Sequence, residues 1–113
     1  RFPSADVLKA APDSRLLIQC LSLNDPPTRA RFEGLFAANE IDTNRIVFTA
    51  AKDFDSYLSG HADVDIVLDT LPWNGHTVSC HALWMGVPVI TLAGNRHSAR
   101  MGVSILTNLD LND

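Results

Sequence analysis

The loop with the most chemistry-bearing side chains begins at Asn74 and reads Asn-Gly-His-Thr-Val-Ser. Gly75 lets a ligand approach the backbone closely, His76 offers a ring donor, and Thr77 and Ser79 offer hydroxyl groups. If a helix begins here, its first N–H groups have no partner within the helix and carry partial positive charge. The combination predicts a cradle for a pyrophosphate. The alternative is that Asn74 or Thr77 only caps the helix and His76 is a surface residue.

Two further loops carry cationic or aromatic side chains. Arg96 and Arg100 are four residues apart, so that at the start of a helix both could reach an anion. A solvated basic helix start is the alternative. In the other loop, Lys52 could meet a phosphate or a ribose and Tyr57 could stack on a base, whereas an exposed lysine and a packed tyrosine are the more ordinary outcome.

These loops follow short apolar runs that are typical of strands buried in a parallel sheet, at residues 16–20, 45–49, 65–69 and 88–92. Helical patterns alternate with them, at residues 4–11, 28–39, 77–85 and 98–106, and residues 53–60 form a short helix or a turn. Gly86 is placed to end the helix over residues 77–85. The alternation predicts an α/β fold, a Rossmann-like parallel sheet with flanking helices. Because ligands bind beyond the carboxyl ends of such strands, we expect the site in the loops after Thr49, Asp69 and Leu92.

Two expectations concern how the Asn-Gly-His-Thr loop is held. Val78, Ala82 and Met85 recur at i, i+4 and i+7, so we expect this face of the helix to pack on the sheet. Asp69 ends the preceding strand, and we expect its carboxylate to anchor the loop by accepting hydrogen bonds from backbone N–H groups.

Composition argues against several classes of protein. The chain has 113 residues, of which 46% are apolar and 19% charged, which suits one soluble globular domain. Its formal charge of −4 and scattered Lys and Arg residues argue against a nucleic-acid-binding face. No apolar run is long enough to span a bilayer, and the first residues show no signal-peptide pattern.

Other chemistries lack their motifs. The loop is neither a Walker A nor a GxGxxG sequence, and no GxSxG elbow occurs. His76 and His81 are five residues apart, whereas the histidines of HExxH are four apart. Cys20 and Cys80 form no CxxC pair, so we expect them to be free, buried thiols.

Three stretches together resemble the catalytic region of the O-linked N-acetylglucosamine transferase family, which includes the Spindly-type protein O-fucosyltransferases. They are Asp-Ile-Val-Leu-Asp-Thr at residues 65–70, Asn-Gly-His-Thr at 74–77, and Ala-Leu-Trp-Met-Gly-Val-Pro-Val-Ile-Thr-Leu at 82–92. Residues 8–17, 44–48 and 98–106 fit the same pattern. The resemblance therefore covers nearly the whole chain.

The resemblance implies a GT-B fold, in which residues 1–113 form most of the second Rossmann-like domain of a larger catalytic region. It implies a cytoplasmic glycosyltransferase that uses a UDP-sugar, usually UDP-N-acetylglucosamine, for inverting transfer to Ser or Thr of proteins. No metal or other cofactor is expected, and neither a nucleic acid nor a membrane is an expected partner. The acceptor protein and the catalytic base belong to regions outside this chain, so the isolated chain is expected to be inactive.

Residue by residue, the resemblance implies that His76, Thr77 and Val78 hold the donor diphosphate, with Gly75 beside them. Val78 stands where the family has a second threonine, so that one hydroxyl is lost while the backbone N–H remains.

The resemblance also implies contacts to the nucleoside. Lys52 lies near the family's donor-binding lysine, His81 stands where a ribose-holding aspartate is common, and Tyr57 replaces a histidine that stacks on uracil. Arg96 and Arg100 remain candidate anion contacts. These departures leave the base and the sugar open. The alternatives are another GT-B enzyme, such as a sugar-nucleotide epimerase or a GDP-fucose-dependent transferase, and a non-catalytic nucleotide-binding domain.

Overall fold

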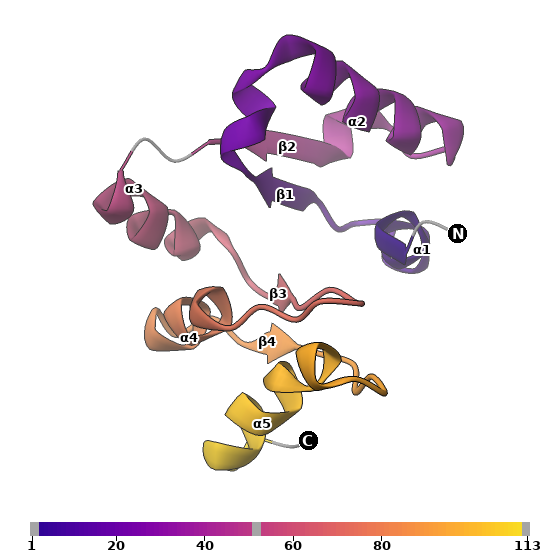
Figure 1. The fold of residues 1–113 in the computed structure, drawn as a ribbon. Coiled ribbons are helices and arrows are strands. Elements are labelled where there is room, and N and C mark those ends of the chain that lie inside the picture. The colour runs from indigo at the N-terminus through magenta and orange to yellow at the C-terminus, as the bar shows by residue number, and fades with distance from the viewer. Residues whose placement is uncertain (1–2, 51–52, 112–113) are drawn as a thin grey trace. The chain divides into compact units, whose positions relative to one another are not determined.

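A computed structural model describes residues 3–50 and 53–111 (Figure 1). The chain divides into two compact units, one ending at Asp53 and the other beginning at Phe54. Each unit holds one pair of parallel strands with helices around it. The assignment of residues 1–113 to a single domain stays a prediction.

The first unit is built on a parallel pair of four-residue strands. Leu16 pairs with Ile46 at one end of the ladder and Gln19 pairs with Thr49 at the other. Phe36 is fully buried at the centre of the core, which also contains Leu8. The elements in chain order are α1 (Pro3–Ala10), β1 (Leu16–Gln19), η1 (Leu21–Asn24), α2 (Pro26–Ala38), η2 (Thr43–Arg45) and β2 (Ile46–Thr49).

The second unit contains the loop that the sequence singles out. Its strands form a short parallel ladder in which Val67 pairs with Val89 and Leu68 with Ile90, and Ala82 of α4 is buried against it. The elements in chain order are α3 (Phe54–Ser59), η3 (Gly60–Asp63), β3 (Val67–Leu68), α4 (Thr77–Trp84), β4 (Val89–Ile90), η4 (His97–Ala99) and α5 (Met101–Asn108).

The ends of the helices follow from local sequence. Asp25 caps α2, because its carboxylate accepts a hydrogen bond from the N–H of Thr28 at 3.0 Å and prolines occupy the first helical positions. Gly86 follows α4 with a φ of 81°, a left-handed conformation that glycine adopts without strain. The prediction that Gly86 ends this helix is therefore confirmed.

The α/β class with parallel strands and flanking helices is confirmed, but one helix was predicted wrongly. The sequence predicted a continuous helix over residues 98–106, whereas a 3-10 turn, η4, ends at Ala99 and α5 starts at Met101. Arg100 breaks the helix with a φ of −131°. The N–H of Gly94 donates to the carbonyl of Ala99 at 2.8 Å, and this contact holds the turn back against its own loop. No helix in the described part of the chain is long and apolar enough to cross a membrane.

The two cysteines are free, as expected, but they are exposed and not buried. Cys20 follows β1 directly, where the strand pair ends, so its side chain has no core to enter. The thiol lies 2.9 Å from the Ser22 hydroxyl. Hydrogen bonds from the Ser22 side chain and backbone lower the pKa of the Cys20 thiol.

Replacing Ser22 with alanine is expected to slow the alkylation of Cys20 by iodoacetamide at pH 8. The thiolate is the reactive species, and loss of the hydroxyl raises the pKa, so that less thiolate is present. Mass spectrometry of the Cys20 peptide follows the rate, and the Cys80 peptide is the internal control. Equal rates for Cys20 in both proteins would contradict the assigned role of Ser22.

Candidate functional site

The N-terminus of α4 is open to a ligand. His76 is its N-cap residue, and no side chain accepts a hydrogen bond there. Among the hydrogen bonds of the described residues, none uses the N–H group of Thr77 or Val78. Asp25 fills the corresponding position of α2 with a carboxylate. An anion at α4 would therefore meet free N–H donors and the positive end of the helix dipole.

Asp69 holds the loop in front of this helix. One carboxylate oxygen, Oδ1, accepts a hydrogen bond from the N–H of Gly75 at 2.6 Å. The other, Oδ2, accepts a hydrogen bond from the Thr91 hydroxyl at 2.8 Å. The predicted anchoring role of Asp69 is thus confirmed, and the same carboxylate also links the loop to the chain that follows β4.

Asn74 is a structural residue that the sequence did not distinguish from a helix cap. It is fully buried. Its backbone N–H donates to the carbonyl of Ser98 at 2.8 Å, its Oδ1 accepts from the N–H of Gly102 at 3.3 Å, and its Nδ2 donates to the carbonyl of Thr70. Asn74 therefore fixes the loop against the start of α5. No local signal reveals this role, because Gly102 lies 28 positions further along the chain.

An open hollow of about 450 Å³ lies in front of the α4 N-terminus, lined by residues 67–70 and 73–79. All four residues predicted to bind a diphosphate line it, namely Gly75, His76, Thr77 and Val78. A Cβ on Gly75 would come within 2.8 Å of the Ser79 hydroxyl, so this close turn favours glycine. The structure thus brings the predicted loop residues together around one hollow.

The predicted packing face of α4 was right at Ala82, which is buried in the core with the strands, and wrong at Val78 and Met85. Val78 is 55% exposed and Met85 39% exposed, whereas Ser79 and Ala82 are the buried positions. Val78 lies in the first turn and lines the hollow, and Met85 is the C-cap residue. The strands that pack with this helix are only two residues long, and Ala82, in the middle of α4, is the residue buried in their core cluster.

Trp73 was not among the predicted site residues, yet it lines the same hollow. Its side chain is 70% exposed. The indole is nearly parallel to the His76 ring, with 6.3 Å between the ring centroids and 10° between the planes. The sequence offered one signal, a tryptophan directly before the Asn-Gly turn, where a buried core position is not expected.

Tyr57 and His81 lie together at a second place. The Tyr57 hydroxyl is 3.2 Å from Nδ1 of His81, and the ring centroids are 5.5 Å apart. Phe54 and His61 complete the aromatic cluster. Burial raises the pKa of the Tyr57 hydroxyl, which is half-buried in this cluster. Two of the three predicted nucleoside contacts, Tyr57 and His81, thus meet at one place, while the third, Lys52, lies outside the described residues.

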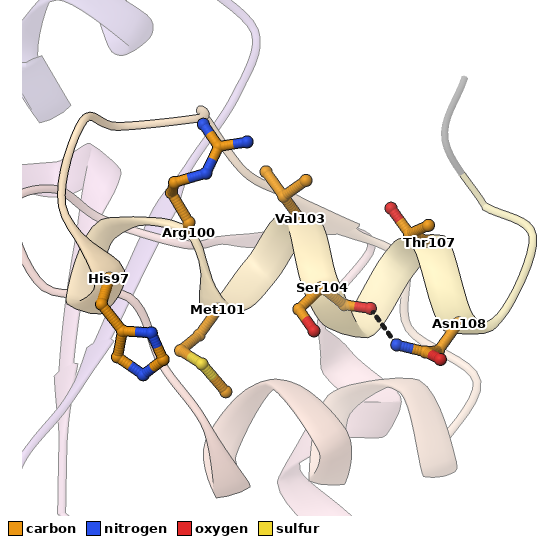
Figure 2. Close-up of a pocket in the computed structure, with 7 residues that line it drawn as sticks. All are labelled: His97, Arg100, Met101, Val103, Ser104, Thr107 and Asn108. Carbon is orange, nitrogen blue, oxygen red and sulfur yellow. Dashed lines mark hydrogen bonds between the residues drawn. The ribbon is translucent and has the colours of Figure 1, made fainter.

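The two arginines do not share a helix, contrary to the geometry expected for them. Arg96 precedes η4 in extended backbone, and Arg100 stands between η4 and α5. The Arg100 guanidinium donates to the carbonyl of Gly94 at 3.1 Å. Figure 2 shows Arg100 and His97 pointing to opposite sides of the start of α5. Both residues line a second hollow of about 390 Å³, which Arg96 does not line.

Metal-ligating side chains do not gather anywhere in the described residues: no three of His, Cys, Asp and Glu lie close enough together to hold an ion. The hydrogen-bond donors of the α4 loop are the structure's clearest provision for a negative charge.

Known proteins resemble this chain along nearly its whole length. Residues 4–113 match Glycosyl transferase family 41. The probable UDP-N-acetylglucosamine–peptide N-acetylglucosaminyltransferase SPINDLY of Arabidopsis thaliana is 34% identical over 108 residues, which are 95% of this chain and 12% of that protein. The probable enzyme of the same activity named SEC, also from Arabidopsis thaliana, is 32% identical over 101 residues, which are 88% of this chain and 10% of that protein.

A solved structure agrees with these relatives. A mutant of the O-GlcNAc transferase of Thermobaculum terrenum superposes with a TM-score of 0.93 at 35% identity, over 96% of this chain and 21% of that chain. The chain thus spans between a tenth and about a fifth of the proteins it matches here. The resemblance seen in the sequence is confirmed, and the chain belongs to glycosyl transferase family 41.

Proposed function

We propose that this chain forms the donor-binding part of a protein glycosyltransferase, which uses UDP-N-acetylglucosamine for inverting transfer to Ser or Thr. The observation that carries the proposal is the open N-terminus of α4, where the N–H groups of Thr77 and Val78 face a hollow and Asp69 holds the loop in place. The names of the relatives, which are UDP-N-acetylglucosamine–peptide transferases, support the choice of donor and acceptor.

The diphosphate of the donor fits the chemistry of this helix end. Free backbone N–H groups and the helix dipole stabilise phosphate oxygens without any proton transfer. During the reaction the acceptor hydroxyl attacks C1 of the sugar and gives its proton to the general base in another part of the full-length protein, while the bond between C1 and the diphosphate oxygen breaks on the opposite face. The leaving diphosphate gains negative charge, which the N–H groups, the Thr77 hydroxyl and His76 stabilise. Preorganised donors of this kind do the work that a metal ion does in other transferases.

We assign the nucleoside to the cluster of Tyr57 and His81. His81 lies in the second turn of α4, one turn beyond the diphosphate loop, so that it can reach the ribose hydroxyls. An aromatic side chain beside it, Tyr57 or Phe54, offers a surface for the base. Lys52, Arg96 and Arg100 remain candidate contacts to the phosphates. We assign the binding of the acceptor protein and the general base to other parts of the full-length protein. We expect the enzyme to act in the cytoplasm.

Replacing His76 with aspartate tests the cradle directly. The new carboxylate would occupy the helix N-terminus, where it stabilises α4 by roughly 0.5–1 kcal/mol through the dipole and the free N–H groups. The same negative charge repels the diphosphate, so we expect UDP to bind the full-length protein at least about tenfold more weakly. Calorimetric titration measures the affinity, and hydrogen exchange of the α4 amides measures helix stability.

The matched control is Ser104→Asp, which adds the same charge on the exposed side of α5 away from the loop. It should leave the affinity for UDP unchanged. If His76→Asp stabilises α4 and leaves UDP binding unchanged, the helix start is only a structural cap and the proposal is wrong. GDP serves as the second ligand, since tighter binding of GDP than of UDP would favour a GDP-sugar transferase.

A further inference from the structure

Trp73 is the largest side chain on the hollow, and the fold does not use it for packing. Its indole is 70% exposed and lies nearly parallel to the His76 ring, with 6.3 Å between the ring centroids. Its neighbour Asn74, by contrast, is fully buried and makes three hydrogen bonds. The backbone that carries the indole is therefore held firmly while the indole itself projects into the hollow.

The order of groups in a nucleotide sugar determines what lies beside Trp73. The diphosphate stands between the nucleoside and the sugar, and we place it on the N–H groups of Thr77 and Val78. The nucleoside extends to Tyr57 and His81, neither of which lines the hollow. The sugar must leave the diphosphate in another direction, and the hollow in front of α4, with Trp73 on its lining, is the space available there.

We infer that Trp73 is the platform for the donor sugar, with its indole against the C–H face of a hexopyranose ring. This inference rests on the proposed function. Ligand sites use aromatic side chains for contact area and a few polar groups for orientation. In this hollow the polar groups come from the α4 loop, and Trp73 supplies the exposed aromatic surface. The indole lies nearly parallel to the ring of His76, a residue of the proposed diphosphate loop, so a sugar on the indole would sit next to the diphosphate.

The test compares UDP with UDP-N-acetylglucosamine on the full-length protein by calorimetric titration. Trp73→Ala is expected to weaken the binding of UDP-N-acetylglucosamine about fivefold while that of UDP changes less than about twofold, because only the larger ligand carries the sugar. Trp73→Phe keeps an aromatic face and should therefore retain most of the affinity for UDP-N-acetylglucosamine. Trp84→Ala is the matched control, since Trp84 is 86% exposed at the far end of α4 and should affect neither ligand.

Each result separates the inference from the function on which it rests. Equal weakening of both ligands by Trp73→Ala would show that the indole supports the diphosphate loop and would overturn the inference. Unchanged binding of both ligands would overturn it as well. If the unaltered protein binds neither UDP nor UDP-N-acetylglucosamine, the proposed function itself fails.

Discussion

Replacing Asp69 with alanine is expected to lower the free energy of opening of the α4 region by about 3 kcal/mol and to abolish UDP binding. Two hydrogen bonds to a charged acceptor are lost, and each contributes roughly 1.5–3 kcal/mol. The N–H of Gly75 and the hydroxyl of Thr91 lose their partner at the same time. Without the anchor, the loop no longer holds its N–H groups at one place, so the cradle is lost along with the stability.

Hydrogen exchange of the α4 amides in the full-length protein measures the free energy of opening. Calorimetric titration with UDP measures the affinity of the phosphate site. Asp69→Asn is the conservative variant: its amide oxygen still accepts from Gly75, and its amide nitrogen can donate to the Thr91 hydroxyl. We expect it to lose only about 1 kcal/mol. Asp65→Ala, at an exposed position two residues before β3, is the control for loss of charge. An effect of Asp69→Ala no larger than that of Asp65→Ala would contradict the anchoring role.

The parts of the fold that could be predicted are those in which a local pattern has one physical solution. The apolar run Leu16–Gln19 is followed by a helix and then by a second apolar run, and parallel pairing of β1 with β2 satisfies that order. The site was located in the same way. A glycine and polar residues between β3 and α4 place free N–H groups at the carboxyl end of a parallel strand.

The parts that could not be predicted depend on residues distant in the sequence. Nothing near Asn74 reveals that its side chain accepts from the N–H of Gly102. The face of α4 was misassigned because a periodic pattern shows which residues are apolar, but not how far the strands beneath the helix extend. Val78 and Met85 fit the apolar stripe, yet they lie beyond a ladder that is only two residues long.

Trp73 shows the same limit for the site. Its position directly before the Asn-Gly turn can be seen in the sequence, but only the structure shows that the side chain is 70% exposed and lines the hollow. The break at Arg100 is likewise a tertiary effect, because the carbonyl of Ala99 is taken by the N–H of Gly94 in place of a continuing helix. Sequence reasoning thus located the loop, while the contacts around it determine which side chains face a ligand.

Gly102 is the point at which these contacts converge. Its N–H donates to the buried Asn74 side chain. A Cβ at this position would overlap the carboxylate of Asp69 and the hydroxyl of Thr91, and would lie 2.8 Å from Cβ of Thr91. The close approach of α5 to the Asp69–Thr91 pair therefore needs a residue without a side chain, even though glycine weakens a helix.

Gly102→Ala is expected to lower the free energy of opening of α4 and α5 by about 2 kcal/mol, because a well-packed site must shift to admit the methyl group. The shift displaces Asp69, so UDP binding should weaken as well. Gly34→Ala in α2 is the matched control: nothing lies within 4 Å of its added Cβ. There we expect a gain of roughly 0.5–1 kcal/mol from the better helix propensity of alanine. Hydrogen exchange of both helices measures the two variants side by side. A gain in stability for Gly102→Ala would mean that α5 does not approach Asp69 as closely as described.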